Sequence, residues 1–167
     1  MGQKEPEWEK SVKWLAQENF GRQAREYNAN ALLADSGNLK AFVSLAGVTP
    51  TDRVLDVATG TGFLATALSV TTKQVVATDL TMPMLEQARV QVGDRGSAAF
   101  ALADAENLPF ASESFDVVAC RVALHHFPHP LVAFDEMARV CRFGGRVVIM
   151  DIVSSEDRPK SDYHNRM

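Results

Sequence analysis

The sequence predicts an α/β domain built on a parallel, doubly wound sheet. Short apolar segments alternate with segments of helical periodicity between residues 53 and 152. The apolar segments run continuously, as in VVAT and VVIM, which is typical of strands that are covered on both faces. Right-handed connections between such strands bring their carboxyl ends to one edge, and ligands bind at that edge in sheets of this kind.

The boundaries of the elements follow from the same patterns. Residues 7–47 are predicted to be helical, with an apolar stripe that includes Trp8, Val12 and Leu15. A last helix in this part, residues 39–46, is expected to be capped by Asn38 and ended by Gly47. Beyond it, we expect strands at residues 53–57, 74–79, 97–103, 115–120 and 145–152, and helices at residues 62–70, 83–92 and 131–141. The chain is thereby divided into a helical N-terminal cap over residues 1–47, a ligand-binding core over residues 48–153 and a tail over residues 154–167.

Composition and charge exclude several classes of protein. The chain has 167 residues, which suits one domain with a sizeable core. A net charge of −4 argues against non-specific nucleic-acid binding, which requires a basic face. No apolar run reaches the ~18 residues of a membrane helix, and the charged N-terminus does not resemble a signal peptide. We therefore expect a cytoplasmic protein without a membrane span or a nucleic-acid partner.

The stretch VLDVATGTG, residues 54–62, joins a predicted strand to a predicted helix through a loop of small residues. Gly60 and Gly62 let the backbone approach a ligand closely, and the start of the helix offers unpaired N–H groups. Residues 60–65 also match the dinucleotide-binding pattern G-x-G-x-x-G/A. However, Asp56 would repel a phosphate beside this loop, so it favours a ligand that is cationic there.

Polar residues also follow the next three strands. Asp79 ends the second strand, where an acid can accept both ribose hydroxyls, although it can also cap the following helix. Asp104 follows the third strand and can accept from the exocyclic amine of adenine, the alternative being a solvated loop acid. Arg121 follows the fourth strand and can hold a carboxylate of the ligand or pair with a protein acid. A ligand with a ribose, an adenine, an amino-acid head group and no phosphate fits this set, and S-adenosylmethionine is such a ligand.

The same motifs resemble those of class I S-adenosylmethionine-dependent methyltransferases, and most closely the ubiquinone/menaquinone-biosynthesis-type subgroup. VLDVATGTG resembles the first motif, with Ala58 where many members carry the first glycine. VVATDLTMPMLEQAR resembles the second motif and ADAENLPFASESFDVV the third and fourth, while RVALHHFPHP and EMARVCRFGGRVVIMD complete the series. The resemblance implies a Rossmann-like sheet of order 3-2-1-4-5, and FGRQAREY implies that Tyr27 lies near the methionine end of the cofactor. It implies cofactor contacts at Asp56, Ala58, Gly60, Gly62, Asp79, Leu80, Asp104, Ala105 and Arg121.

The sheet of that family ends in a C-terminal antiparallel hairpin, which is missing after residues 145–152 of this chain. We therefore expect an apparently truncated domain whose last strand lies at an open edge of the sheet. Open edges favour pairing with another chain, so a homodimer through this edge is expected.

The predicted function is methyl transfer from S-adenosylmethionine to an oxygen, carbon or nitrogen nucleophile on a small, quinone-like or aromatic molecule. His126 is a candidate general base, although positioning alone can supply most of the rate of such a displacement. No metal site is expected, because no Cys or acid near His125, His126 and His129 in the sequence completes a set of ligands. One alternative is a non-catalytic domain that binds the nucleoside or a partner chain. The other is an NAD-dependent oxidoreductase, which Asp56 and Asp104 disfavour.

Overall fold

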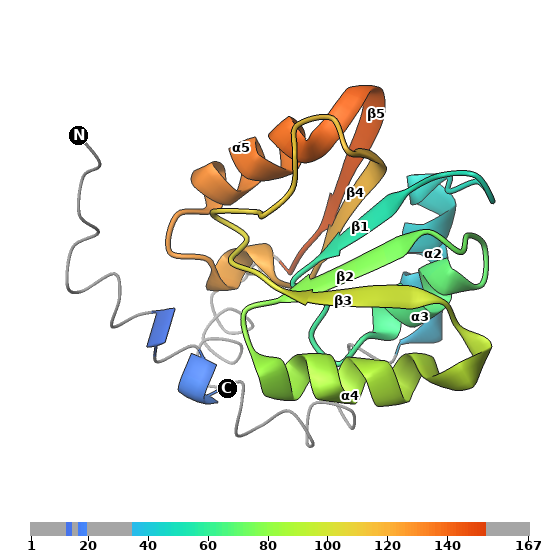
Figure 1. Ribbon diagram of the computed structural model, residues 1–167, viewed down its shortest axis with the longest axis horizontal. Coiled ribbons are helices and arrows are strands. Elements are labelled where there is room, and N and C mark those ends of the chain that lie inside the picture. The colour runs from blue at the N-terminus through green and yellow to red at the C-terminus, as the bar shows by residue number, and fades with distance from the viewer. Residues whose placement is uncertain (1–12, 15–16, 20–34, 153–167) are drawn as a thin grey trace, which may run out of the picture.

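A computed structural model describes residues 13–14, 17–19 and 35–152 of the chain. These residues form a five-stranded parallel sheet of order β3-β2-β1-β4-β5 (Figure 1). Its strands are β1 (Val54–Val57), β2 (Val75–Asp79), β3 (Ala98–Leu102), β4 (Phe115–Arg121) and β5 (Cys141–Met150). The predicted doubly wound sheet of order 3-2-1-4-5 is therefore confirmed.

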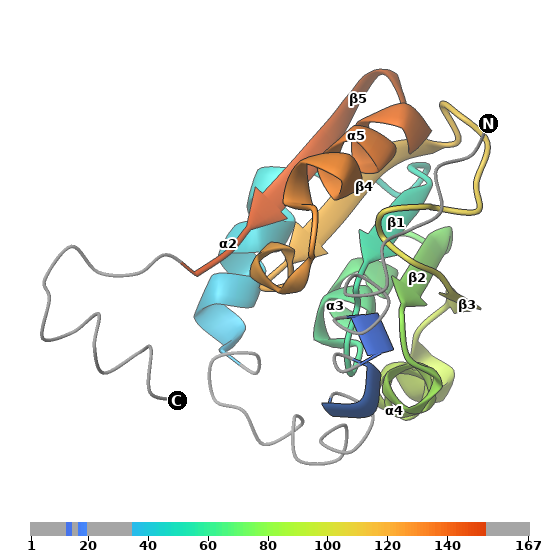
Figure 2. The same ribbon diagram turned by 90° about the vertical axis from the view of Figure 1, so that its left-hand side faces the viewer.

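Helices cover both faces of this sheet (Figures 1 and 2). They are α2 (Ser36–Ala46), α3 (Phe63–Ser69), α4 (Met82–Val92) and α5 (Pro130–Val140), with short 3₁₀ turns η1 (Gly93–Arg95) and η2 (Leu124–His126). Helices α2, α3 and α4 pack on one face, and α5 packs on the other. In the described part of the chain, no helix is long and apolar enough to cross a bilayer.

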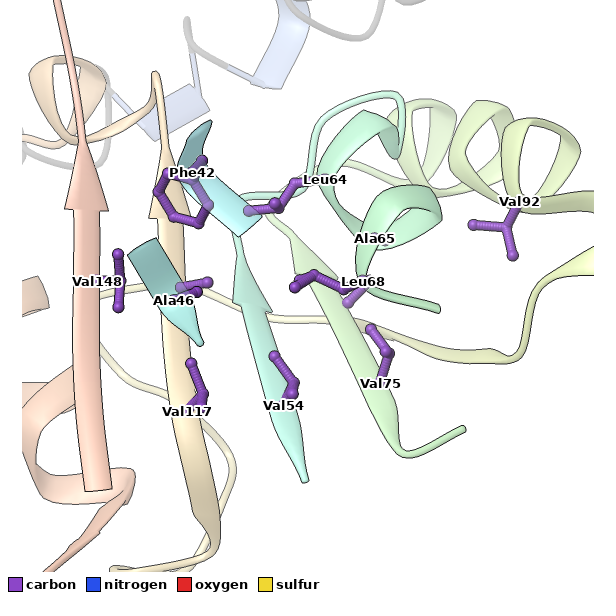
Figure 3. Close-up of a cluster of buried hydrophobic side chains, with 12 residues drawn as sticks. Phe42, Ala46, Val54, Leu64, Ala65, Leu68, Val75, Val92, Val117 and Val148 are labelled. Atoms are coloured by element: carbon purple, nitrogen blue, oxygen red, sulfur yellow. The ribbon is translucent and has the colours of Figure 1, made fainter. Parts of the chain in front are cut away.

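The two hydrophobic cores explain why the strands read as continuous apolar runs. Successive side chains of a strand point to opposite faces of the sheet. Val54 and Val117 accordingly pack with Phe42 on the face that carries α2 (Figure 3), whereas Leu55 and Val118 pack against α5 on the other face. All five of these side chains are fully buried. A strand buried on both faces has no polar position in its middle, so its sequence does not alternate.

The start of α2 differs from the prediction. The expectation that Asn38 caps this helix was wrong, because the carboxylate of Asp35 occupies the N-cap position. Asp35 accepts from the backbone N–H of Asn38, whose own side-chain amide donates to the other carboxylate oxygen. Gly47 ends the helix as expected, with a φ of 56°. Phe42 and Ala46 are fully buried against the sheet, so α2 belongs to the core although it falls within the expected cap.

β5 begins at Cys141, four residues before the expected start of the strand, and follows α5 directly. Its pairing with β4 shifts register between Phe115–Cys141 and Val117–Arg146, and this shift accommodates Gly144 at a φ of 73°. Among the described strands β5 pairs with β4 alone, which leaves it at the edge of the sheet. The predicted homodimer through this edge remains a prediction. The predicted tail over residues 154–167 lies outside the described residues.

Candidate functional site

A cavity lies at the carboxyl-terminal edge of the sheet and encloses about 820 Å³ of space that is partly open to solvent. Segments that follow β1, β2, β3 and β4 supply its walls. The predicted site residues that line it are Ala58, Gly60, Asp79, Leu80, Asp104, Ala105 and His126. Tyr27, another predicted site residue, lies outside the described residues.

The loop after β1 turns sharply enough to expose its backbone to the cavity. Ala58 and Gly60 both adopt left-handed backbone conformations, with φ angles of 55° and 56°. Such a conformation strains a residue with a Cβ, such as Ala58, at about 1–3 kcal/mol. A Cβ added to Gly60 would meet nothing within 4 Å. The backbone at Gly60 is therefore open to a ligand.

Gly62 is required for the packing of two helices. It does not line the cavity, and it precedes α3 with a φ of 88°. A Cβ at this position would lie 2.8 Å from both the Cα and the Cβ of Ala88 in α4. The structure therefore requires glycine here so that α3 and α4 can approach closely. The predicted cofactor contact of Gly62 remains a prediction.

Asp56 and Arg121 lie beneath the loop instead of in the wall of the cavity. Asp56 is 1% exposed, and its carboxylate accepts a 2.6 Å hydrogen bond from the hydroxyl of Thr59. Arg121 is 8% exposed at the end of β4. Their predicted contact with a ligand therefore stays a prediction. Strand alternation turns Asp56 to the same face as the buried Val54.

Burial raises the pKa of Asp56 to about 7, and the nearby carboxylate of Asp79 adds to the rise. The hydrogen bond from Thr59 and the charge of Arg121 oppose this rise without cancelling it. Burial also lowers the pKa of Arg121, against the opposing charge of Asp56. The loop thus rests on a carboxyl group that titrates near neutral pH.

The raised pKa of Asp56 predicts a pH-dependent stability. Between about pH 4 and pH 7 the folded state binds this proton more strongly than the unfolded state, so the free energy of unfolding falls as the pH rises through that window. Asp56→Asn removes the titration, while its amide oxygen still accepts from Thr59. The free energy of unfolding of the variant minus that of the wild type is expected to be about 2 kcal/mol larger at pH 8 than at pH 5. Urea unfolding at both pH values measures this, with exposed Asp94→Asn as the charge-matched control. If the difference in unfolding free energy between variant and wild type is the same at pH 5 and pH 8, the expectation is contradicted.

Asp79 lines the cavity with its carboxylate already held by three donors. One oxygen accepts from the backbone N–H of Gly60 at 2.9 Å, and the other accepts from the backbone N–H and the hydroxyl of Thr81, each at 3.0 Å. Burial raises the pKa of Asp79, and these donors oppose the rise. The alternative that Asp79 caps the following helix is not realised, because Thr81 is the N-cap of α4. Asp79 instead joins the glycine loop to the start of α4.

The carboxylates after β3 are paired with a lysine that the sequence did not single out. Lys13 Nζ lies 2.8 Å from an oxygen of Asp104 and 2.8 Å from an oxygen of Glu106. The backbone N–H of Glu106 donates to the other oxygen of Asp104 at 2.9 Å. The alternative that Asp104 is a solvated loop acid is therefore not realised. Lys13 and Asp104 are 91 residues apart, and no local pattern in the sequence connects them.

Helix α5 holds the loop that carries these carboxylates. Glu136 accepts from the backbone N–H of Leu108 at 2.8 Å. Arg139 donates to the backbone carbonyls of Leu108 and Phe110, and it also pairs with Glu136. The loop after β3 is thus fixed to a helix, so Asp104 is held in one position relative to the cavity.

His126 lies in the cavity wall beside residues that follow β4. Burial lowers its pKa, and the charge of His125 lowers it further. The His126 ring lies 3.8 Å, centroid to centroid, from the ring of His125, whose Nδ1 is 2.6 Å from Asp151. Asp151 and Glu106 are distant in the sequence from the histidines that they contact, so the sequence alone did not reveal either contact. Within the described part of the chain, no three His, Cys, Asp or Glu side chains gather as metal ligands.

The cavity suits a nucleoside without phosphate. Lys13 is the one Lys or Arg that lines it in the described part of the chain, and two carboxylates already neutralise its charge. The acids at Asp79 and Asp104 suit the hydroxyls of a ribose and the amine of an adenine.

Residues 55–149 match the methyltransferase-domain family. The chain belongs to this family. It is 31% identical over 150 residues to the uncharacterized methyltransferase YcgJ of Bacillus subtilis, a match that covers 89% of this chain and 59% of YcgJ. It is 41% identical over 115 residues to the ubiquinone/menaquinone biosynthesis C-methyltransferase UbiE of Pseudomonas putida, covering 65% of this chain and 45% of UbiE.

The fold agrees with this assignment. The crystal structure of a methyltransferase candidate from Bacillus halodurans superposes with a TM-score of 0.70 and 35% identity, covering 78% of this chain and 58% of that one. The domain is a Rossmann-like methyltransferase domain. This chain spans about half the length of the curated relatives that it matches.

Proposed function

We propose that the protein transfers the methyl group of S-adenosylmethionine to a small-molecule acceptor. The observation that carries this proposal is the division of the cavity into two ends. Asp79 ends β2 and Asp104 follows β3, whereas Ala123, His126 and Phe127 follow β4 on the other side of β1. One end is therefore acidic and suits a nucleoside, and the other is largely apolar and suits an acceptor.

Within this proposal each part of the edge has its own role. Asp79 binds the ribose hydroxyls, and Asp104 with the backbone of Ala105 binds the adenine. The backbone around Ala58 and Gly60 approaches the methionine end, with Asp56 and Arg121 supporting the loop from below. The resemblance implies that Tyr27 also belongs near that end. The bound cofactor supplies an electrophilic methyl group on a sulfonium.

His126 is proposed to act as the general base toward the acceptor. Its lowered pKa keeps the imidazole neutral near pH 7, so that a ring nitrogen can take a proton. The apolar neighbours Ala123 and Phe127 favour a flat, aromatic or quinone-like acceptor over a charged one. The C-methyltransferase name of the UbiE relative supports the same class of acceptor.

Transfer of a radiolabelled methyl group to a panel of quinols, phenols, amines and carboxylates tests the proposal. We expect labelled product with a quinol or phenol. His126→Gln is expected to lower kcat by about 10²-fold, while the affinity for S-adenosylhomocysteine stays within about threefold because His126 does not face the nucleoside end. Cofactor binding without transfer to any acceptor would instead favour the non-catalytic nucleoside-binding domain. An unchanged kcat in the variant would remove His126 as the base.

A further inference from the structure

We propose that Lys13 and Gln17 form a further part of the cofactor site, covering the adenosine half of the nucleoside. In this arrangement the charge of Lys13 holds the adenine-binding carboxylates in place. The inference rests on the proposed function only in requiring that the cavity take an S-adenosylmethionine-type nucleoside. No motif of the sequence includes either residue.

The environment of Lys13 is unusual for a lysine. Its side chain is only 14% exposed and lines the cavity, whereas lysines are almost never buried without a partner. The ammonium group lies 2.8 Å from Asp104 and 2.8 Å from Glu106. These carboxylates raise the pKa of Lys13 although burial lowers it, so the side chain remains a cation. Its aliphatic part is left to form a wall of the cavity.

Gln17 extends the same contact toward the ribose. The side-chain amide of Gln17 donates to the backbone carbonyl of Leu80 at 3.2 Å, directly after Asp79. Trp14, beside Lys13 in the sequence, is 57% exposed. Lys13 and Gln17 thus reach the segments that carry the acids assigned to the adenine and to the ribose.

Lys13 and an adenine can share Asp104 instead of competing for it. Each carboxylate oxygen has two acceptor positions. One oxygen of Asp104 accepts from the backbone N–H of Glu106 and the other accepts from Lys13, so each keeps one position for a ligand amine. Lys13 therefore orients Asp104 without consuming its capacity to accept.

Removing the charge of Lys13 would disturb this end of the cavity. The side chain of Glu106 is only 6% exposed, and its remaining contacts in the described part of the chain are with the backbone N–H and the ring of His129. A buried carboxylate that loses its cation is strongly unfavourable. We expect the side chain of Glu106 to turn toward solvent. This would also displace Asp104, because the carboxylate of Asp104 accepts from the backbone N–H of Glu106.

Calorimetric titration and stopped-flow dissociation of S-adenosylhomocysteine from the full chain test the inference. Lys13→Met keeps the aliphatic wall but removes the charge, and we expect about tenfold weaker binding, mostly through faster dissociation. Lys13→Arg keeps the charge and is expected to stay within about threefold. The exposed Lys40→Met in α2 is the matched control and should not change the affinity. Should Lys13→Met lose the wild-type circular dichroism spectrum, Lys13→Gln takes its place.

A double-mutant cycle with Glu106→Gln isolates the proposed contact. The neutral amide of Gln at position 106 no longer needs a cation. We therefore expect Lys13→Met to weaken the binding of S-adenosylhomocysteine much less in the Glu106→Gln background than in the wild type. Full additivity, or a change of less than twofold in Lys13→Met, would overturn the inference and leave the proposed function intact. Tighter binding by Lys13→Met would also overturn it, since Lys13 would then compete with the adenine. A wild-type chain that fails to bind S-adenosylhomocysteine would overturn the proposed function itself, and the inference with it.

Discussion

Asp79→Ala is expected to weaken the binding of S-adenosylhomocysteine by about 2–4 kcal/mol, which is about 30- to 1,000-fold. Two hydrogen bonds between ribose hydroxyls and a charged acceptor would be lost, at ~1.5–3 kcal/mol each, less what water restores. The loop would also lose the bond from the backbone N–H of Gly60, which adds to the effect. Calorimetric titration of wild type and variant measures the change.

Two matched variants separate ligand binding from support of the loop. Asp79→Asn keeps an oxygen that accepts one bond and should lose less affinity than Asp79→Ala. Thr81→Val removes the hydroxyl bond to the same carboxylate but leaves the acid facing the cavity, so it should change the affinity little. If Asp79→Ala binds within about threefold of wild type while the fold is intact, Asp79 serves only to organise the turn.

Gly62→Ala is expected to lower the free energy of unfolding by about 2–4 kcal/mol. The new Cβ would lie 2.8 Å from backbone and side-chain carbons of Ala88. Overpacking of this kind costs ~1–3 kcal/mol, and the positive φ of 88° adds strain. Urea unfolding measures the loss.

Gly60→Ala is the matched comparison for Gly62→Ala, because its φ is also positive but no atom lies within 4 Å of the added Cβ. We expect it to destabilise by only about 1–2 kcal/mol. Gly60 lines the cavity and Gly62 does not, so Gly60→Ala should weaken cofactor binding more. Equal destabilisation by the two substitutions would contradict the assignment of Gly62 to helix packing.

The doubly wound class of the sheet was predictable because its strands are apolar on both sides, whereas its strand order followed from the resemblance to methyltransferases. Val54 and Leu55 are adjacent in sequence but join different cores, and this double burial is what a continuous apolar run encodes. The ends of the elements were less predictable. Asp35 and Asn38 are both good N-cap residues, and the local sequence does not select between them.

The site was predictable where its residues follow the strands directly. Asp79 and Asp104 meet in one cavity because parallel strands end at the same edge. Asp56 lies within β1, where the alternation of side chains turns it into the core, and its predicted contact with the cofactor remains a prediction. Lys13 was missed because its contacts cross 91 residues of sequence, and only the folded chain brings them together.

Parallel calorimetric titrations of the unmodified chain with S-adenosylhomocysteine and with NAD test the central claim most directly. The acids in the cavity and the neutralised charge of Lys13 predict saturable binding of S-adenosylhomocysteine and no measurable heat with NAD. Micromolar binding of NAD with no response to S-adenosylhomocysteine would contradict the account.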